Sequence, residues 1–206
     1  LSLHDALPIL YNQILQEESH NSEIVENFVQ KSQNELERIE SLIQNLLKIT
    51  KIDSKTIILN KASVNVKKLI TKILYSFETR AEKEGKSISI RGLENTNLFC
   101  DYEWISEALS NLIKNALDNT KENDKIMIEW VETPITTIIS VSDTGNGIHI
   151  EDIHHIFKRF YRSKFSKSNQ GLGLGLPLVK SIIEQHNGTI TVESNFLQGS
   201  TFTLSF

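Results

Sequence analysis

The ten residues IISVSDTGNG at positions 138–147 join an apolar strand to a turn that holds one carboxylate and two glycines. A carboxylate at the end of a strand, as Asp143 is here, can accept a hydrogen bond from the amino group of a bound base. Gly145 and Gly147 allow the backbone to turn sharply and to approach a ligand closely. Taken alone, such a turn is more often a plain turn than a binding site. Its interpretation therefore depends on the surrounding segments.

A second glycine-rich segment, GLGLGL at positions 171–176, is followed by Pro177. Glycines that lead into a helix N-terminus expose backbone N–H groups to an anion such as a phosphate. The alternative is a flexible hinge, and the segment alone does not decide between the two. The mostly polar stretch from 148 to 175 is long for a loop inside a compact domain, which predicts a lid.

A helix predicted over 104–119 places Glu107, Asn111 and Asn115 on one face, because these residues are four apart. Amide oxygens are suitable ligands for Mg²⁺, which binds mostly through waters and phosphates. The alternative is an ordinary solvated helix face, and this pattern alone favours that alternative.

The flanking periodicity predicts a mixture of helices and strands after residue 53. This order indicates the α+β class, as a two-layer α/β sandwich with an antiparallel or mixed sheet. The predicted helices cover 66–77, 104–119 and 175–186, and the predicted strands cover 87–90, 125–132, 136–142, 189–194 and 201–205.

Residues 10–53 differ from the rest because they are polar and contain no Gly or Pro. Mostly three- and four-residue steps between apolar residues predict one stripe on a long helix. Residues 10–16 are interpreted as the end of an earlier helix and 17–21 as the turn of a hairpin. One stripe cannot bury itself on an isolated hairpin, so we expect a homodimeric four-helix bundle. The stripe consists of Ile24, Phe28, Leu36, Ile39, Ile43, Leu46, Leu47 and Ile49.

Composition excludes several classes of protein. The 206 residues have a formal net charge of −4, which argues against a nucleic-acid partner. One cysteine, Cys100, cannot form an internal disulfide, which fits a reducing compartment. No apolar run approaches the roughly 20 residues that span a bilayer, and we see no secretory signal peptide.

Together these segments resemble the ATP-binding domain of sensor histidine kinases, within the wider family of gyrase, mismatch-repair and heat-shock chaperone ATPases. The resemblance covers about 60–206 and extends more loosely over the hairpin through 36–51. It rests on an N box at 111–116, a first glycine box at 143–147, a phenylalanine box at 156–162, a second glycine box at 171–175, and the closing residues 186–188 and 199–202.

The resemblance implies ATP and Mg²⁺ as cofactors. It assigns Asp143 to the adenine amino group, with Gly145 and Gly147 lining the adenine pocket. It assigns Asn115 to Mg²⁺ and places Asn111 close to the phosphates. Phe157 and Phe160 would anchor the lid through apolar contacts. The remaining expected nucleotide contacts are Gly171, Leu172, Gly173, Leu174, Gly175, Lys158 and Arg162, and the expected catalytic residues are Asn111, Asn115 and Lys114.

The residue at position 111 distinguishes activities within this superfamily. The ATPase relatives have a glutamate four residues before the metal-binding asparagine, where it activates water. Asn111 cannot act as a general base, so the sequence favours phosphoryl transfer to a histidine over hydrolysis. Two alternatives stay open: an ATP-binding dimerisation module without kinase activity and, less favoured, a superfamily ATPase.

Two positions depart from the family pattern. Many members carry a basic and then an aromatic residue near the phosphates, where this chain has Asp118 and Asn119. Asp118 would add negative charge there, so we expect compensation from Lys114 and from the lid. The lid residues 148–170 contain five Lys or Arg and two Asp or Glu, a local net charge of +3.

The phosphoacceptor histidine is not assigned. His4 is followed by Asp5 and by Pro8, whereas the family has the proline five positions after its histidine. Residues 1–9 match a translated sequencing adapter, and we expect this segment to be non-native and the true protein to be truncated there. The expected organisation is therefore a partial hairpin at 10–53 and a catalytic ATP-binding domain at 60–206.

The resemblance also implies the setting of the intact parent. A response-regulator receiver domain is the expected partner, besides a second copy bound through the hairpin. The chain is expected to be the cytoplasmic portion of a protein of the cytoplasmic membrane, attached only through absent upstream segments.

Overall fold

The computed structural model describes residues 22–54, 58–164 and 172–206. The chain divides into two compact units, Leu1–Leu47 and Lys48–Phe206. The long helix predicted near the N-terminus is α2 (Ser22–Asp53), which continues into the second unit. Its apolar stripe is partly exposed: Leu36 is 61% and Ile43 is 53% exposed. The earlier helix at 10–16 and the turn at 17–21 lie outside the described residues.

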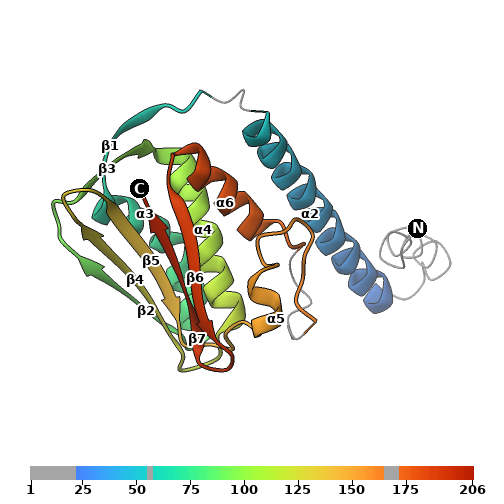
Figure 1. The fold of residues 1–206 in the computed structure, drawn as a ribbon. Coiled ribbons are helices and arrows are strands. Elements are labelled where there is room, and N and C mark those ends of the chain that lie inside the picture. The colour runs from blue at the N-terminus through green and yellow to red at the C-terminus, as the bar shows by residue number, and fades with distance from the viewer. Residues whose placement is uncertain (1–21, 55–57, 165–171) are drawn as a thin grey trace. The chain divides into compact units, whose positions relative to one another are not determined.

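A five-stranded mixed sheet forms one layer of the second unit (Figure 1). Its order is β2-β4-β5-β7-β6, with β2 parallel to β4 and the other neighbours antiparallel. Buried and less buried residues alternate along most of the central strands, so one face of the sheet is buried. The strands are β2 (Ser87–Gly92), β4 (Lys125–Glu132), β5 (Thr137–Asp143), β6 (Thr189–Asn195) and β7 (Gly199–Ser205).

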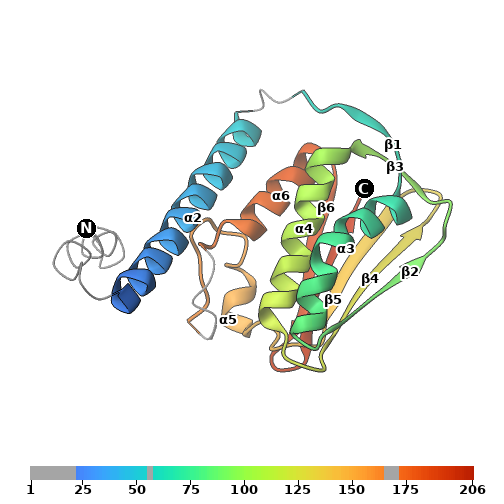
Figure 2. The ribbon, with the colours of Figure 1, turned by 180° about the vertical axis from the view of Figure 1, so that it is seen from behind.

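Three helices form the second layer on that buried face, as Figure 2 shows from behind. They are α3 (Val66–Lys83), α4 (Tyr102–Asn119) and α6 (Gly175–Gln185). Leu109, Leu112 and Leu117 of α4 are completely buried between the neighbouring elements. The predicted α+β class with a two-layer sandwich is therefore confirmed.

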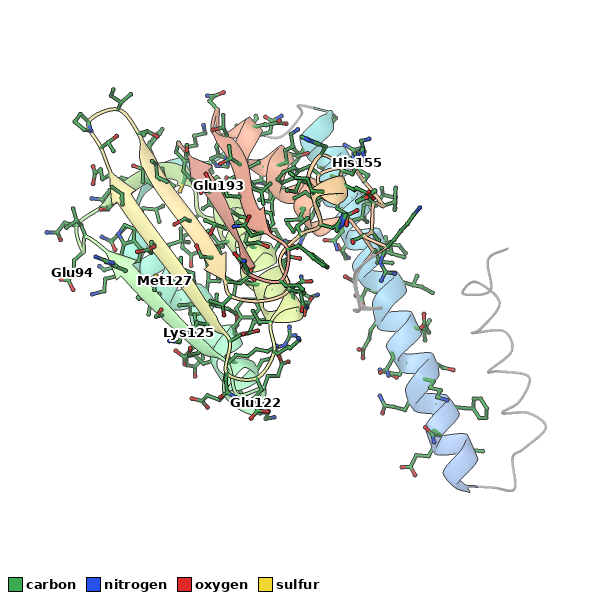
Figure 3. The ribbon with its side chains drawn as sticks, turned by 60° about the horizontal axis from the view of Figure 1, so that its bottom comes forward. Glu94, Glu122, Lys125, Met127, His155 and Glu193 are labelled. Carbon is green, nitrogen blue, oxygen red and sulfur yellow. The ribbon has the colours of Figure 1, made fainter. Side chains whose placement is uncertain are left out.

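The opposite face of the sheet is mostly polar, although it also carries some apolar side chains. It includes the exposed Glu193 and the 39%-exposed Met127, both labelled in Figure 3. Because serine and threonine occupy most of the outward positions of β7, this face is suited to solvent.

Two short strands were not predicted. β1 (Lys61–Asn65) pairs antiparallel with β3 (Asn97–Asp101) as a separate two-stranded sheet. The helix predicted at 66–77 continues to Lys83, and the described part of the lid contains a single turn of helix, α5 (Ile150–Ile153).

Asp101 connects β3, α4 and the chain before β1. Its Oδ1 accepts hydrogen bonds from the backbone N–H groups of Glu103 and Trp104 and so caps α4. Its Oδ2 accepts from the backbone N–H of Asn60 at 2.8 Å. Its own N–H donates to Nε2 of the buried His186 at 3.1 Å. The first turn of α4 is thereby held from two sides.

Candidate nucleotide-binding site

One face of α4 holds a row of half-buried polar side chains, opposite the leucines of the core. The row begins with the three residues expected from the sequence and continues to the end of the helix. Its members are Glu107, Asn111, Asn115 and Asn119, each four residues after the one before.

Hydrogen bonds along this row fix the orientation of the amides. Asn111 donates through Nδ2 to the backbone oxygen of Glu107 at 2.9 Å and to its Oε1 at 3.3 Å. Asn119 donates through Nδ2 to the backbone oxygen of Asn115 at 2.8 Å and to its Oδ1 at 3.2 Å. Glu107 Oε1 also accepts from Lys48 Nζ at 2.8 Å. The side-chain atom that Asn115 turns toward Asn119 is therefore an oxygen.

The turn after β5 buries the carboxylate of Asp143, which is 8% exposed. Burial raises the pKa of Asp143, although the backbone N–H groups of Gly145 and Ser200 oppose the shift by bonding to the charged form. The Gly145 N–H donates to Asp143 Oδ1 at 2.9 Å. These contacts hold the carboxylate in one position before any ligand arrives.

The same turn packs directly against the end of α4. The Asn146 N–H donates to the backbone oxygen of Asn119 at 3.1 Å. A Cβ at Gly145 would lie 2.2 Å from that oxygen, and a Cβ at Gly147, where φ is +61°, would lie 2.1 Å from the Asn195 oxygen. Only glycine fits both positions, so close packing by itself requires these residues.

The described part of the second glycine segment lies against the polar row near Asn111, away from the Asn119 end. Gly171 lies outside the described residues. A Cβ at Gly175 would lie 3.1 Å from Asn111 Oδ1. Leu172 is half-buried, whereas Leu174 is 1% exposed, so its side chain belongs to the core. The structure thus brings both glycine turns and both asparagines together along one face of α4.

Contacts within the described part of the lid involve two residues outside the sequence motifs, Asp152 and Ser163, besides Tyr161 of the phenylalanine box. Asp152 is 3% exposed and accepts hydrogen bonds from the hydroxyls of Tyr161, at 2.5 Å, and Ser163. The ring of Tyr161 lies 5.3 Å from that of His155, labelled in Figure 3. A Cβ at Gly173, where φ is +68°, would lie 2.4 Å from the Tyr161 oxygen.

The phenylalanines of the lid differ from each other. Phe157 is half-buried, with Lys180 Nζ 5.9 Å from its ring centroid. Phe160 is 61% exposed, so the expectation that its side chain anchors the lid is wrong. The backbone of Phe160 does connect the lid to the second glycine segment, because its N–H donates to the Gly173 oxygen at 3.0 Å.

The basic candidates lie at the surface. Lys114 is exposed on α4, and Lys158 and Arg162 are exposed in the lid. The expected uncompensated charge of Asp118 is not observed, because Arg80 of α3 donates through Nη2 to Asp118 Oδ1 at 2.7 Å. The compensation for Asp118 therefore comes from α3, and neither Lys114 nor the lid is needed for it.

A depression of about 600 Å³ lies away from this row, between the α3–β2 turn and the loop after α4. Three lysines and three glutamates line it, so its charges balance, and it contains none of the residues discussed above. Its lining consists of Glu82, Lys83, Glu84, Gly85, Lys86, Thr120, Lys121 and Glu122.

The donor set fits a magnesium ion held mainly by phosphates and water. Within the described parts of the chain, no three His, Cys, Asp or Glu residues cluster as a metal site would require. Asn115 offers one oriented amide oxygen, which suits an ion that keeps most of its ligands from elsewhere.

Residues 100–206, about half of the chain, match the family described as histidine kinase-, DNA gyrase B-, and HSP90-like ATPase. The chain belongs to this family. Domains of the histidine kinase-like ATPase family bind ATP, and the matched residues include both asparagines and both glycine turns.

Individual relatives of this histidine kinase-like ATPase chain are sensor kinases. Sensor protein SrrB of Staphylococcus aureus is 31% identical over 173 residues, which make up 83% of this chain and 30% of that protein. The histidine kinase AdeS of Acinetobacter baumannii has a TM-score of 0.81 at 23% identity, covering 99% and 94% of the two chains. The histidine kinase ThkA, solved in complex with response regulator protein TrrA, has a TM-score of 0.82 at 24% identity. The match covers 99% of this chain and 57% of that chain. The chain is thus homologous to sensor histidine kinases and spans less than a third of SrrB.

Proposed function

We propose that this chain is the catalytic ATP-binding portion of a sensor histidine kinase. Its intact parent would phosphorylate its own histidine from Mg-ATP and pass the phosphoryl group to an aspartate of a response regulator. The observation that carries the proposal is the convergence of Asp143, the paired asparagines and the described glycines along α4, within a chain homologous to sensor kinases.

Each group in the site has a definite task in this proposal. The Asp143 carboxylate accepts from the adenine amino group, while Gly145 and Gly147 let the backbone approach the base. The segment from Gly171 to Gly175 supplies backbone N–H groups to the phosphates, and Lys158, Arg162 and Lys114 supply positive charge. Asn115 Oδ1 would hold Mg²⁺, which when bound neutralises charge on the phosphate oxygens.

Phosphoryl transfer is favoured over hydrolysis because the described residues of the polar row on α4 offer no suitable base for water. Position 111 is an amide, and the carboxylate one turn away, Glu107, is engaged by Asn111 and Lys48. An imidazole nitrogen has its own lone pair and needs no strong activation to attack the γ-phosphate. Catalysis would then consist mainly of positioning and charge neutralisation.

The decisive experiment mixes the purified chain with a separate histidine-bearing hairpin domain and γ-labelled ATP. We expect acid-labile, base-stable label on the hairpin, as phosphohistidine requires. Binding of ATP without any transfer would instead support the inert dimerisation module. Release of inorganic phosphate at the same rate with and without the hairpin would support an ATPase.

The setting of the parent is part of the proposal. The partly exposed stripe of α2, with Leu36, Ile43 and Leu47 between 49% and 61% exposed, supports dimerisation through a hairpin at 10–53. The proposal further includes a catalytic domain at 60–206, a response-regulator partner and membrane attachment through other segments. The solved complex of the histidine kinase ThkA with response regulator TrrA supports the choice of partner. Across the described helices, none has the length and apolarity that a bilayer crossing requires.

A further inference from the structure

Asn119, the last residue of α4, contacts both sides of the candidate site. Its side chain donates to Asn115, at 2.8 Å to the backbone oxygen and 3.2 Å to Oδ1. Its backbone oxygen accepts from Asn146 at 3.1 Å and lies where Gly145 leaves room for it. One residue therefore joins the candidate metal ligand to the turn that holds the candidate adenine-binding carboxylate.

The side-chain contact determines which atom Asn115 can offer to a cation. An amide group has an oxygen on one side and an N–H₂ group on the other, and only the oxygen can bind a metal ion. The Nδ2 donor of Asn119 is satisfied by an oxygen and repelled by a second N–H₂ group. Because the Asn115 oxygen has two lone pairs, it can accept from Asn119 and still bind an ion.

We propose that Asn119 is a positioning residue for magnesium, which presets the Asn115 amide with its oxygen available and couples metal binding to the adenine side of the site. This inference rests on the proposed function, since it requires that Asn115 bind the metal of a Mg-nucleotide. Asn119 itself contacts neither ion nor nucleotide in this scheme.

A plain helix-capping role is the competing explanation, because Asn119 also bonds the Asn115 backbone oxygen. The neighbouring residue provides a matched control. Thr120 donates through its hydroxyl to the backbone oxygens of Ala116 at 2.8 Å and Leu117 at 3.2 Å, so its side-chain hydrogen bonds do not go to the Asn115 side chain. Thr120→Val therefore removes a similar bond at the same helix end and leaves the Asn115 amide untouched.

The test measures the ATP affinity of the whole chain by calorimetry, once with Mg²⁺ and once with a chelator. It compares the unmodified chain with the variants Asn119→Leu and Thr120→Val. The magnesium gain is the factor by which Mg²⁺ increases the affinity for ATP. We expect the magnesium-free affinity of Asn119→Leu to stay within about twofold of that of the unmodified chain. Its magnesium gain should be ~5-fold smaller. Thr120→Val should keep the full gain, even if its melting temperature falls. Magnesium-free affinity also verifies that each variant is folded.

Four results would overturn the inference or its premise. If Asn119→Leu keeps both its magnesium-free affinity and its magnesium gain, the positioning role is rejected. An equal loss with and without Mg²⁺, or the same loss of gain in Thr120→Val, assigns Asn119 to general helix-end packing. If the unmodified chain binds no ATP under either condition, the proposed function itself fails.

Discussion

The two sides of the candidate site are built differently. On the adenine side, Asp143 is 8% exposed and bonded to Gly145, and the turn is fastened to the end of α4. On the lid side, the described segment after β5 contains one four-residue helix, and Lys158 and Arg162 are exposed. Recognition of a base by directional hydrogen bonds needs fixed donors and acceptors, whereas charge neutralisation of phosphates tolerates looser geometry. The comparison therefore predicts separable contributions to affinity.

The largest expected effect tests the fixed side. Asp143→Asn should weaken ATP binding about 100-fold, because it replaces a buried charged acceptor by an amide that can point a donor at the adenine amino group. Calorimetric titration measures the loss. Glu193→Gln, the same change of charge on the exposed outer face of the sheet, should leave affinity unchanged (Figure 3). Retained affinity in Asp143→Asn would refute the adenine assignment.

Asn111 lies at the lid end of the polar row, next to Gly175. Asn111→Glu should raise ATP hydrolysis in the absence of an acceptor histidine by about 10-fold, since it supplies a base able to activate water. A phosphate-release assay measures this rate, with Asn111→Gln as the isosteric control without a base. Equal turnover in the two variants would argue against the role assigned to position 111.

The lid side is tested by removing one hydroxyl. Tyr161→Phe deletes the bond to the buried Asp152 and keeps the ring against His155. We expect ATP affinity to fall ~5-fold and adenosine affinity to stay unchanged, because adenosine has no phosphates for the lid to contact. Measuring both ligands by competition sharpens the comparison. An equal loss for adenosine would show that the two sides are not separable.

The smallest expected effect concerns stability and not binding. Burial lowers the pKa of His186, whose Nδ1–H donates to the Ile182 oxygen while Nε2 accepts from Asp101. Below about pH 6.5 the unfolded chain takes up a proton at this position before the folded chain does. The stabilisation by neutral His186 is thus complete above that pH and is lost as the pH falls toward the lowered pKa.

Urea unfolding between pH 5 and 7.5 measures this dependence. His186→Ala should be less stable at neutral pH and should show a shallower fall in unfolding free energy on acidification. Parallel curves for the two proteins would assign the pH dependence to other groups.

The sequence predicted the parts of the fold that depend on local alternation. β4 was predicted over its full length and β5 within one residue, because buried residues alternate with less buried ones along β5 and along β4 as far as Trp130. β1 and β3 were missed because each has five residues and their pairing joins segments about 35 residues apart. The end of α3 was missed because its last turns are mostly charged.

The same distinction applies to the site. Asn111, Asn115 and Asp143 are found within short motifs, whereas the pairing of Asp118 with Arg80 joins two helices and has no local signal. Asn119 did have a signal, since it continues the four-residue spacing of the row on α4. Asp152 had no distinguishing signal in the sequence, because an acidic residue is expected in the first turn of any helix.

The joint at Asp101 has a mechanical consequence. The backbone at Asn60, just before β1, is fastened through one carboxylate to the first turn of the helix that bears Asn111 and Asn115. A displacement of the chain at Asn60 would therefore reach the N-terminus of α4 directly, through hydrogen bonds to a single side chain. No strand has to separate from its neighbour for α4 to be affected.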